Sequence, residues 1–395
     1  MSYLEGVEGV EGVEGVEGVE GVEGVEGVEG VGAFSRTPVG ALITHREGIV
    51  GPWAPVGGAA WPSGEVLRGV PGPLDRWDPR IRRFLFESEL LSSLYFGVDP
   101  APVVGTKQWA TLWNFEVTPL ALNPTVYPPH IATGLQAPAG TWRRFITMNR
   151  PTPAILLKQL DLVNGYADLR VDRAREIVAQ MSPQYAFWGS VVPLHPARHQ
   201  RTIELIGMVL RLAKYAEMNF KHALCVRRPH EYSAQIQPMI QTPIHGSLPS
   251  GHSTEAHAVA RVLGALISGP TNTGSAQQSQ LRQQLMAQAA RIAINRTVAG
   301  VHYPVDSQAG QMLGLALGEY FIARATGSFA SVKAWEFDGE LYPDVDDFTG
   351  AEIYDVQNDI PKQLPYMIPN TTNATITVNP APGLNWLWTE AGREW

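Results

Sequence analysis

The sequence predicts an all-α fold, in which a helical bundle is wrapped by irregular N- and C-terminal segments. Three observations predict it. Apolar residues recur at helical spacing in several long segments, as they do on the buried face of an amphipathic helix. The longest of these segments have no proline in their interior, and the one strand-like run, 374–378, is short. Helices of this kind pack most simply as a bundle.

Seven segments carry the helical pattern. In the first, an apolar face begins at Ile81 and continues to Leu94. In a later and longer one, the charged residues Arg211 and Lys214 stand between apolar positions, and Pro304 is suited to the first position of the last helix. The expected helices are 80–95, 155–163, 172–181, 201–224, 253–267, 276–295 and 304–325. The Gly- and Pro-rich stretch 32–79 predicts an irregular arm, and the residues from Ser331 onward predict a C-terminal wrap.

The N-terminus is a low-complexity repeat. Residues 5–31 are Glu-Gly-Val repeated nine times, which supplies nine of the 38 acidic groups. The formal charge is −8 for the whole chain, but without the repeat it is 30 − 29 = +1. Since such a repeat can bury very little, we expect a disordered tail over 1–32. We expect 33–395 to be a single α-helical domain, and its near-neutral charge excludes a broadly basic nucleic-acid-binding protein.

Cysteine content and hydropathy narrow the class of protein further. Cys225 is the single cysteine, which excludes an internal disulfide framework and a cysteine-ligated metal cluster. No stretch reaches the ~18 uncharged apolar residues of a membrane span, and the best candidate, 312–323, contains Glu319. The N-terminus has neither the basic start nor the apolar run of a secretory signal. We therefore expect a cytoplasmic protein without a membrane span.

Two short motifs place cations and a helix start where an anion could bind. The first, at the end of the expected helix 201–224, holds Lys221 and Arg228 seven residues apart, although a pair of cations by itself is more typical of a solvated surface. The second is Pro-Ser-Gly-His at 249–252, directly before an apolar helical pattern. Gly251 lets the backbone approach a ligand closely, and the free N–H groups of a helix start bind anions.

The third motif runs from Arg296 to Asp306 and contains His302 just ahead of another helix start. Asp306, four residues after His302, can bond one imidazole nitrogen and fix the tautomer, which leaves the other nitrogen free as a nucleophile or a ligand. Together the three motifs supply three cations, two helix starts and two histidines between 221 and 306. A tetrahedral oxyanion with two or three negative charges suits such a site.

These motifs resemble a known superfamily. Lys221-x6-Arg228-Pro229, Pro249-Ser250-Gly251-His252 and Arg296-x5-His302-x3-Asp306 are similar to the three motifs shared by vanadium-dependent haloperoxidases and the type 2 phosphatidic acid phosphatases, a group that includes soluble bacterial acid phosphatases. The resemblance implies a helical bundle of the vanadium haloperoxidase and acid phosphatase type. It departs at Asn295, where phosphatases of the group usually have Ser.

The resemblance also implies a role for each matching residue. His302 would bond to the central atom of the oxyanion, and so would be the ligand of vanadium if the oxyanion is vanadate. His252 would be the acid–base residue, and Asp306 would orient His302. The residues that would bind the oxyanion are Lys221, Arg228, Ser250, Gly251, His252, Arg296 and His302.

His245 favours the haloperoxidase within this superfamily. It lies seven residues before His252, where the resemblance places Phe in chloride-oxidising haloperoxidases and His in bromide- or iodide-oxidising ones. Phosphatases of the group resemble neither there, and a loop histidine without a role is the alternative. The chain also has no predicted span, unlike the lipid phosphatases, and it extends far on both sides of the motifs, unlike the soluble acid phosphatases.

We therefore expect a vanadate-dependent haloperoxidase that oxidises bromide or iodide with hydrogen peroxide to hypohalous acid, which then halogenates organic acceptors. In this hypothesis His252 handles protons and Lys221 polarises the bound peroxide. The alternative is a soluble acid phosphatase that acts through a phosphohistidine at His302, and the motifs alone do not separate the two. A non-catalytic scaffold that associates through the repeat is a third hypothesis. The resemblance implies a homo-oligomer, and the organic acceptor stays open.

Overall fold

The structure is a computed structural model that describes residues 74–98, 107–117, 140–182, 184–268, 276–327, 330–351, 353–355, 360–369 and 374–395. The predicted tail 1–32 and nearly all of the predicted arm 32–79 lie outside these ranges. Contacts divide the chain into two compact units, Met1–Arg82 with Pro129–Ile131, and the remainder. That 33–395 form a single domain stays a prediction.

The described part of the first unit is short. It contains η3 (Leu74–Arg76) and the beginning of α3 (Pro79–Leu91). Arg82 is buried, and its Nη1 donates to the carbonyl oxygens of Leu74 at 2.9 Å and Trp77 at 3.0 Å. These two bonds tie the 3-10 turn to the first turns of the helix.

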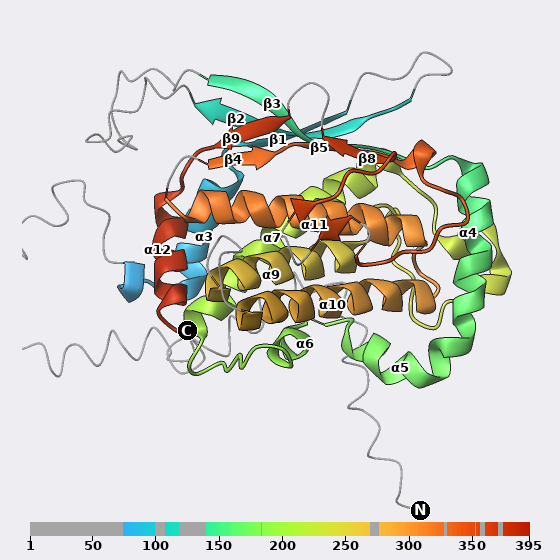
Figure 1. Ribbon diagram of the computed structural model, residues 1–395, viewed down its shortest axis with the longest axis horizontal. Helices are drawn as coiled ribbons and strands as arrows, with labels where there is room; N and C mark the ends of the chain where they lie inside the picture. Colours follow the sequence, from blue (N-terminus) through green and yellow to red (C-terminus); the bar gives the residue numbers. More distant parts are fainter. Residues whose placement is uncertain are drawn as a thin grey trace, which may run out of the picture. The chain divides into compact units, whose positions relative to one another are not determined.

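Four long helices form a bundle in the second unit. They are α7 (Gln200–Leu224), α9 (Gly251–Ser268), α10 (Ala276–Val298) and α11 (Pro304–Ala325). α9 packs against each of the other three, and Figure 1 shows α9, α10 and α11 side by side. Of the residues of α11, all but Glu319 are buried, so this helix lies at the centre of the unit. The predicted ranges 201–224, 253–267, 276–295 and 304–325 are confirmed to within a few residues.

The shorter helices are a mixture of predicted and unpredicted ones. α4 (Pro153–Gly165) and α5 (Arg170–Ala179) confirm the predicted helices 155–163 and 172–181. Thr152 caps the N-terminus of α4, because its side chain accepts a hydrogen bond from the backbone N–H of Ile155 at 3.3 Å. The elements that were not predicted are α6 (Tyr185–Gly189), α8 (Pro229–Tyr232), α12 (Pro382–Gly392), η5 (Tyr166–Leu169), η6 (Ala234–Ile236) and η7 (Gly339–Leu341).

A five-stranded sheet lies against the α11 side of the bundle (Figure 1), so the expectation of a purely α-helical chain is wrong. The strand order is β1-β2-β3-β5-β8, in which β3 and β5 pair in parallel and the other neighbours are antiparallel. The strands are β1 (Leu94–Val98), β2 (Ala110–Val117), β3 (Gly140–Asn149), β5 (Trp335–Asp338) and β8 (Met367–Pro369). The C-terminal segment is thus part of a layered α and β structure.

One strand of the sheet was missed because the helical spacing of 80–95 includes its first residues. Leu94 continues the apolar period of α3, but the helix ends at Leu91 and Leu94 begins β1. Burial of Leu94 is compatible with either element, and pairing with β2 decides between them. The described part of the second unit also contains two smaller antiparallel ladders. β4 (Ala330–Lys333) pairs with β9 (Thr375–Val378), which confirms the strand-like run 374–378, and β6 (Tyr354–Asp355) pairs with β7 (Ile360–Pro361).

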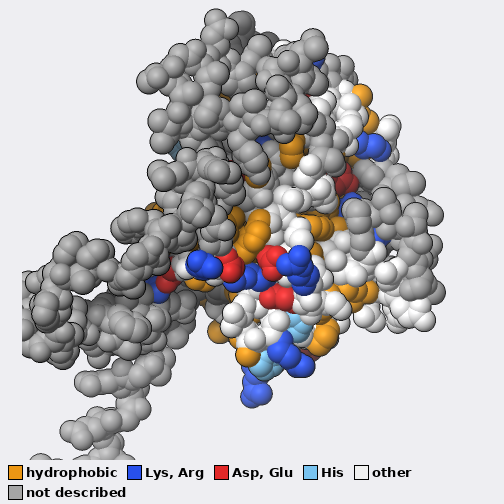
Figure 2. All heavy atoms as spheres, turned by 90° about the vertical axis from the view of Figure 1, so that its left-hand side faces the viewer, with side chains coloured by type: hydrophobic (Ala, Val, Ile, Leu, Met, Phe, Trp, Pro, Cys, Tyr) orange, Lys and Arg blue, Asp and Glu red, His pale blue; other side chains and the backbone are white. Residues whose placement is uncertain are grey.

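The surface is mixed in charge. On the face in Figure 2, acidic and basic side chains lie beside one another. Opposite charges also lie together in ion pairs such as Arg201 with Glu204, at 3.2 Å, and Arg211 with Glu87, at 3.5 Å. This agrees with the near-neutral balance outside the repeat. Within the described ranges, no helix is both long and apolar enough to cross a membrane.

Candidate active site

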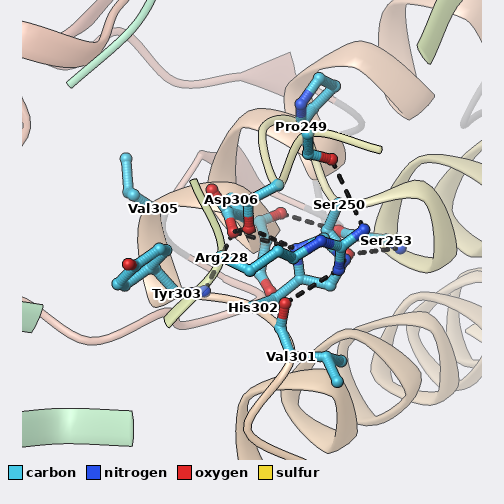
Figure 3. A network of polar contacts seen from close by, with 12 residues as sticks. Arg228, Pro249, Ser250, Ser253, Val301, His302, Tyr303, Val305 and Asp306 are labelled. Carbon is cyan, nitrogen blue, oxygen red and sulfur yellow. Dashed lines mark hydrogen bonds and ion pairs between the residues drawn. The ribbon is translucent and has the colours of Figure 1, made fainter. Parts of the chain in front are cut away.

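The three sequence motifs meet at one end of the bundle. Figure 3 shows Arg228, which precedes α8, beside Ser250 at the start of α9 and His302 and Asp306 at the start of α11. The backbone N–H of Ser250 donates to the carbonyl oxygen of Asp306 at 2.9 Å, and this bond joins the starts of the two helices. Because α9 packs against both α7 and α11, residues more than 70 positions apart share one small volume.

His302 and Asp306 form a buried, hydrogen-bonded pair in the site. Pro304 is the first residue of α11, and the backbone at Tyr303 is extended, with φ −87° and ψ 159°. The Asp306 carboxylate turns back and accepts hydrogen bonds from the Tyr303 N–H at 3.0 Å and from His302 Nδ1 at 2.9 Å. Ser247 Oγ donates to the same carboxylate oxygen at 2.5 Å. His302 is therefore held with its proton on Nδ1 and its lone pair on Nε2.

Arg228 faces that lone pair. Its guanidinium is buried, and Nη1 lies 3.3 Å from His302 Nε2 and donates to the carbonyl oxygen of Val301 at 2.9 Å. An arginine can only donate, so the contact agrees with an unprotonated Nε2. Burial, together with the charges of Arg228 and Lys221, holds the pKa of His302 well below its usual range. The imidazole is thus neutral and nucleophilic at neutral pH.

Lys221 contacts main-chain oxygens in the loop before α9. Its buried Nζ donates to the carbonyl oxygens of Pro249 at 2.6 Å, Ser247 at 3.2 Å and Gly246 at 3.3 Å. Three acceptors match the three N–H donors of an ammonium group. Burial and the nearby Arg228 charge lower the pKa of Lys221 to about 7. Lys221 thus holds the loop in place, and its predicted direct contact with an oxyanion stays a prediction.

Gly251 and His252 begin α9 beside the same loop. A Cβ at Gly251 would lie 2.9 Å from a carboxylate oxygen of Glu217, so a larger residue would require that buried side chain to shift. His252 is half-buried, and its Nε2 lies 2.9 Å from the carbonyl oxygen of Gln180. Burial and the Arg296 charge hold the pKa of His252 well below its usual range. His252 is therefore neutral until a negative charge comes near.

Of the three motif cations, Arg296 is the one with side-chain donors that no described residue accepts. It lies in the last turn of α10 and is 1% exposed. Its Nη2 donates to the Gln180 side-chain oxygen at 2.9 Å and to the carbonyl oxygen of Ile177 at 3.1 Å. Its Nε and Nη1 are buried and have no hydrogen-bond partner within the described part of the chain. Burial lowers the pKa of Arg296 only to about 10, so the group stays charged and a tetrahedral oxyanion would fit its two unpaired donors.

His245 lies against Arg228. Its Nδ1 is 3.1 Å from Arg228 Nη2, and Arg228 Nε donates to the carbonyl oxygen of His245 at 3.2 Å. Burial, with a contribution from the Lys221 charge, lowers the pKa of His245 to about 4. The ring is thus neutral and half-buried at the edge of the site. Its predicted role in halide selectivity stays a prediction.

Several residues of the site were missed by sequence reasoning. Ser247 was not singled out, although it stands only two positions from the second motif. Gln180 lies far from the motifs in sequence, whereas Glu217 lies four positions before Lys221, and neither a glutamine nor a glutamate in a helical pattern gives a signal of its own. Asn295 was noted only as a departure from the family pattern. Its amide donates to Glu176 at 2.9 Å and to Gln180 at 3.0 Å.

Other histidines lie outside the site. His257 is buried on α9, and its Nδ1 lies 2.7 Å from the carbonyl oxygen of Ser253, which is the contact of a packing histidine. His222 is exposed although it is adjacent to Lys221. In the ranges that the structure covers, no cluster of three His, Cys, Asp or Glu residues is arranged to hold a metal cation.

Comparison with known proteins supports the superfamily. Residues 204–326 match the family described as the PAP2 superfamily. Among solved structures, the chain is similar to a transmembrane PAP2-type phosphatidylglycerolphosphate phosphatase from Bacillus subtilis, with 20% identity, 43% of this chain and 81% of that chain covered, and a TM-score of 0.27. A search of curated proteins gives no match. The matched segment contains all three motifs, so the similarity of residues 204–326 to a PAP2 superfamily domain includes the candidate site.

Proposed function

We propose that the site hydrolyses phosphate monoesters through a phosphohistidine at His302. The observation that carries the proposal is the state of His302, whose Nδ1 is bonded to Asp306 and whose Nε2 lone pair faces Arg228. The PAP2 superfamily match of 204–326 supports this choice over the haloperoxidase hypothesis. The substrate class is a phosphate ester, because the contacts of the site define the end that would bind the oxyanion.

In the first step, Nε2 of His302 attacks phosphorus, a P–N bond forms, and the bond from phosphorus to the ester oxygen breaks. Arg228 and Arg296 offset the charge on the non-bridging oxygens, which grows as the leaving group departs. The leaving oxygen takes a proton from His252. Although burial keeps His252 neutral by itself, the charge of an incoming phosphate raises its pKa and favours the protonated form.

In the second step, a water molecule attacks the phosphohistidine. His252, now neutral, takes a proton from that water, the P–N bond breaks, and inorganic phosphate leaves. Nε2 of His302 regains its lone pair, while Asp306 keeps the proton of His302 on Nδ1 throughout. The net reaction consumes one ester and one water and gives one alcohol and one phosphate, so the site returns to its starting state.

The test is hydrolysis of p-nitrophenyl phosphate by the full chain. We expect His302→Ala to lower kcat/KM by about 10⁴-fold, because it removes the nucleophile. His222→Ala changes an exposed histidine that lies within the first motif, so it is the matched control and should retain the parent rate. Rapid quench with labelled ester should trap phosphate on His302. Full hydrolysis by the His302→Ala protein would reject the proposal.

The location of His245 favours a second candidate, a vanadate-dependent haloperoxidase. The ring contacts Arg228 at 3.1 Å, so it adjoins the proposed oxyanion as the halide-selective residue would. The unpaired nitrogens of Arg296 fit vanadate as well as they fit phosphate. In this candidate His302 Nε2 would be the vanadium ligand, with Arg228, Ser250 and Gly251 beside it. Vanadate, when bound, would supply an electrophilic centre that activates hydrogen peroxide toward a halide.

One preparation can separate the two candidates. After incubation with orthovanadate, a haloperoxidase should brominate or iodinate a phenol dye when peroxide is added, and His245→Phe should change the ratio of bromide to chloride oxidation. A phosphohydrolase should instead cleave p-nitrophenyl phosphate and be inhibited by orthovanadate. Brisk ester cleavage without any halogenation would eliminate the second candidate.

A further inference from the structure

We infer that Gln180 is a positioning residue of this site, which holds Arg296 and His252 together and leaves the charge of Arg296 available to the oxyanion. Gln180 directly follows α5 and is fully buried. Its side-chain oxygen accepts from Arg296 Nη2 at 2.9 Å, and its main-chain oxygen is 2.9 Å from His252 Nε2. One residue thus contacts two groups of the proposed mechanism, and the inference rests on that mechanism.

The contact with His252 fixes a tautomer. A carbonyl oxygen can only accept, so His252 Nε2 carries a proton and donates it to Gln180. The other ring nitrogen, Nδ1, then holds the lone pair in the neutral ring. Nδ1 is therefore the atom at which His252 gains and loses the proton of the reaction, while Nε2 keeps the ring in place.

The contact with Arg296 uses a neutral acceptor. A carboxylate in the place of the Gln180 amide would compensate the buried guanidinium and weaken its attraction for an anion. The acidic group nearby is Glu176, and its two carboxylate oxygens accept from Arg291 at 2.7 and 2.6 Å. Arg291 thus neutralises Glu176, and Arg296 keeps its charge together with two unpaired nitrogens.

Asn295 completes this arrangement and accounts for the departure from the family pattern. Its amide nitrogen donates to the Gln180 side-chain oxygen at 3.0 Å and to Glu176 at 2.9 Å, while its amide oxygen accepts from Arg173 at 2.9 Å. A serine hydroxyl has one donor hydrogen and cannot make all three contacts. Asn295, together with the bond from Gln180 Nε2 to Glu176 at 3.2 Å, therefore orients the Gln180 amide so that its oxygen faces Arg296.

The experiment measures binding of inorganic phosphate to the full chain by calorimetry. At pH 8 we expect Gln180→Glu to raise the Kd about 100-fold, because a near-isosteric carboxylate would pair with Arg296. Gln180→Met, which removes the acceptor of Arg296 and the donor to Glu176 without adding charge, should raise the Kd about tenfold. Gln311→Glu places the same change at a buried glutamine on α11 that bonds Gly350, and it should leave the Kd unchanged.

The pH dependence of the Kd separates a positioning role of Gln180 from a packing role. As the pH falls and the introduced carboxyl group of Gln180→Glu is protonated, its Kd relative to the parent should recover, whereas that of Gln180→Met should not. An equal loss in both variants at every pH would overturn the inference, as would a folded Gln180→Glu protein with the parent Kd. If neither variant folds, Asn295→Ser decides, since it should raise the Kd about threefold and an unchanged Kd rejects the role.

Failure of the proposed function gives a result that differs from failure of the role of Gln180. If the parent binds phosphate but cleaves no ester, the mechanism at His302 fails while the Kd values still judge Gln180. If the parent binds neither phosphate nor orthovanadate, the oxyanion site and the role of Gln180 fail together.

Discussion

His302 and Arg296 are both assigned to the proposed oxyanion, but the chain supports them differently. The ring of His302 is fixed by Asp306, and Asp306 in turn accepts from Ser247 and Tyr303. Arg296 has only Nη2 bonded, and its other two nitrogens lack partners among the residues that are described. A nucleophile needs one orientation and one tautomer before the substrate arrives, whereas a binding cation needs free donors. The difference divides the site into a reacting half, which is His302 with Asp306, and a binding half, which is Arg296.

Removal of the Arg296 side chain should break the binding half and leave the reacting half in place. We expect Arg296→Met to raise the inhibition constant of orthovanadate about 10³-fold, because a buried charge and two donors are lost. Arg324→Met is the control, since Arg324 is also buried but bonds to main-chain oxygens away from the site. It should lower the free energy of unfolding without changing the inhibition constant. Equal inhibition of the Arg296→Met and parent proteins would contradict this division.

A pH profile of kcat/KM should show the contribution of Lys221 to the site. Burial lowers its pKa to about 7, so above that pH the Nζ group loses a proton, a positive charge and one of the donors that hold the loop 246–249. We expect kcat/KM to fall about tenfold per pH unit above the pKa of Lys221. The Lys221→Met protein should be weak at every pH and lack this alkaline limb. The same limb in that variant would assign the titration to another group.

The lowered pKa of Lys221 also makes the free energy of unfolding depend on pH. The pKa of Lys221 is about 7 in the fold and near 10.5 in an unfolded chain, so between these values the unfolded state binds more protons. Stability from this group therefore rises as the pH increases through that window. Urea unfolding at several pH values would measure the slope, and in Lys221→Met the contribution should vanish.

Removal of the Ser247 hydroxyl should loosen the reacting half. We expect Ser247→Ala to lower kcat about tenfold with little change in KM, because Asp306 loses one of the bonds that orient it. The free energy of unfolding should fall by about 1–2 kcal/mol. Ser307→Ala removes another buried hydroxyl of the same region, which bonds Ala293, and serves as the control for stability alone. A loss of kcat of the same size in both proteins would show that orientation of Asp306 is not the cause.

The smallest effect is expected from the repeat. Residues 5–31 supply nine acidic groups but none of the residues assigned to either half of the site. We expect deletion of 5–31 to leave kcat/KM within about twofold of the parent at low salt, where long-range charge effects are largest. A large loss of turnover would mean that the repeat takes part in catalysis or assembly, as the scaffold hypothesis requires.

Most of the bundle was predictable because its signals are local. The periods of α7, α9, α10 and α11 lie within single segments, and Pro304 begins α11 where the sequence predicts. The sheet was missed because its strands are short and far apart in the chain. β3 pairs with β2 on one side and with β5, almost 190 positions later, on the other. Pairing over such distances leaves no periodic signal in any one strand.

The sequence alone determined the three motifs, the helix starts that carry two of them, and the pairing of His302 with Asp306. These features depend on residues a few positions apart, so local geometry suffices. Only the tertiary structure decided which cation keeps free donors. Lys221 is bonded to the loop 246–249, and Arg296 is held by α5 and by Gln180 just beyond it, a segment more than 110 positions away in sequence. The hydrogen-bond partners of a buried side chain are set by which segments pack around it, and packing is not encoded in the spacing of a motif.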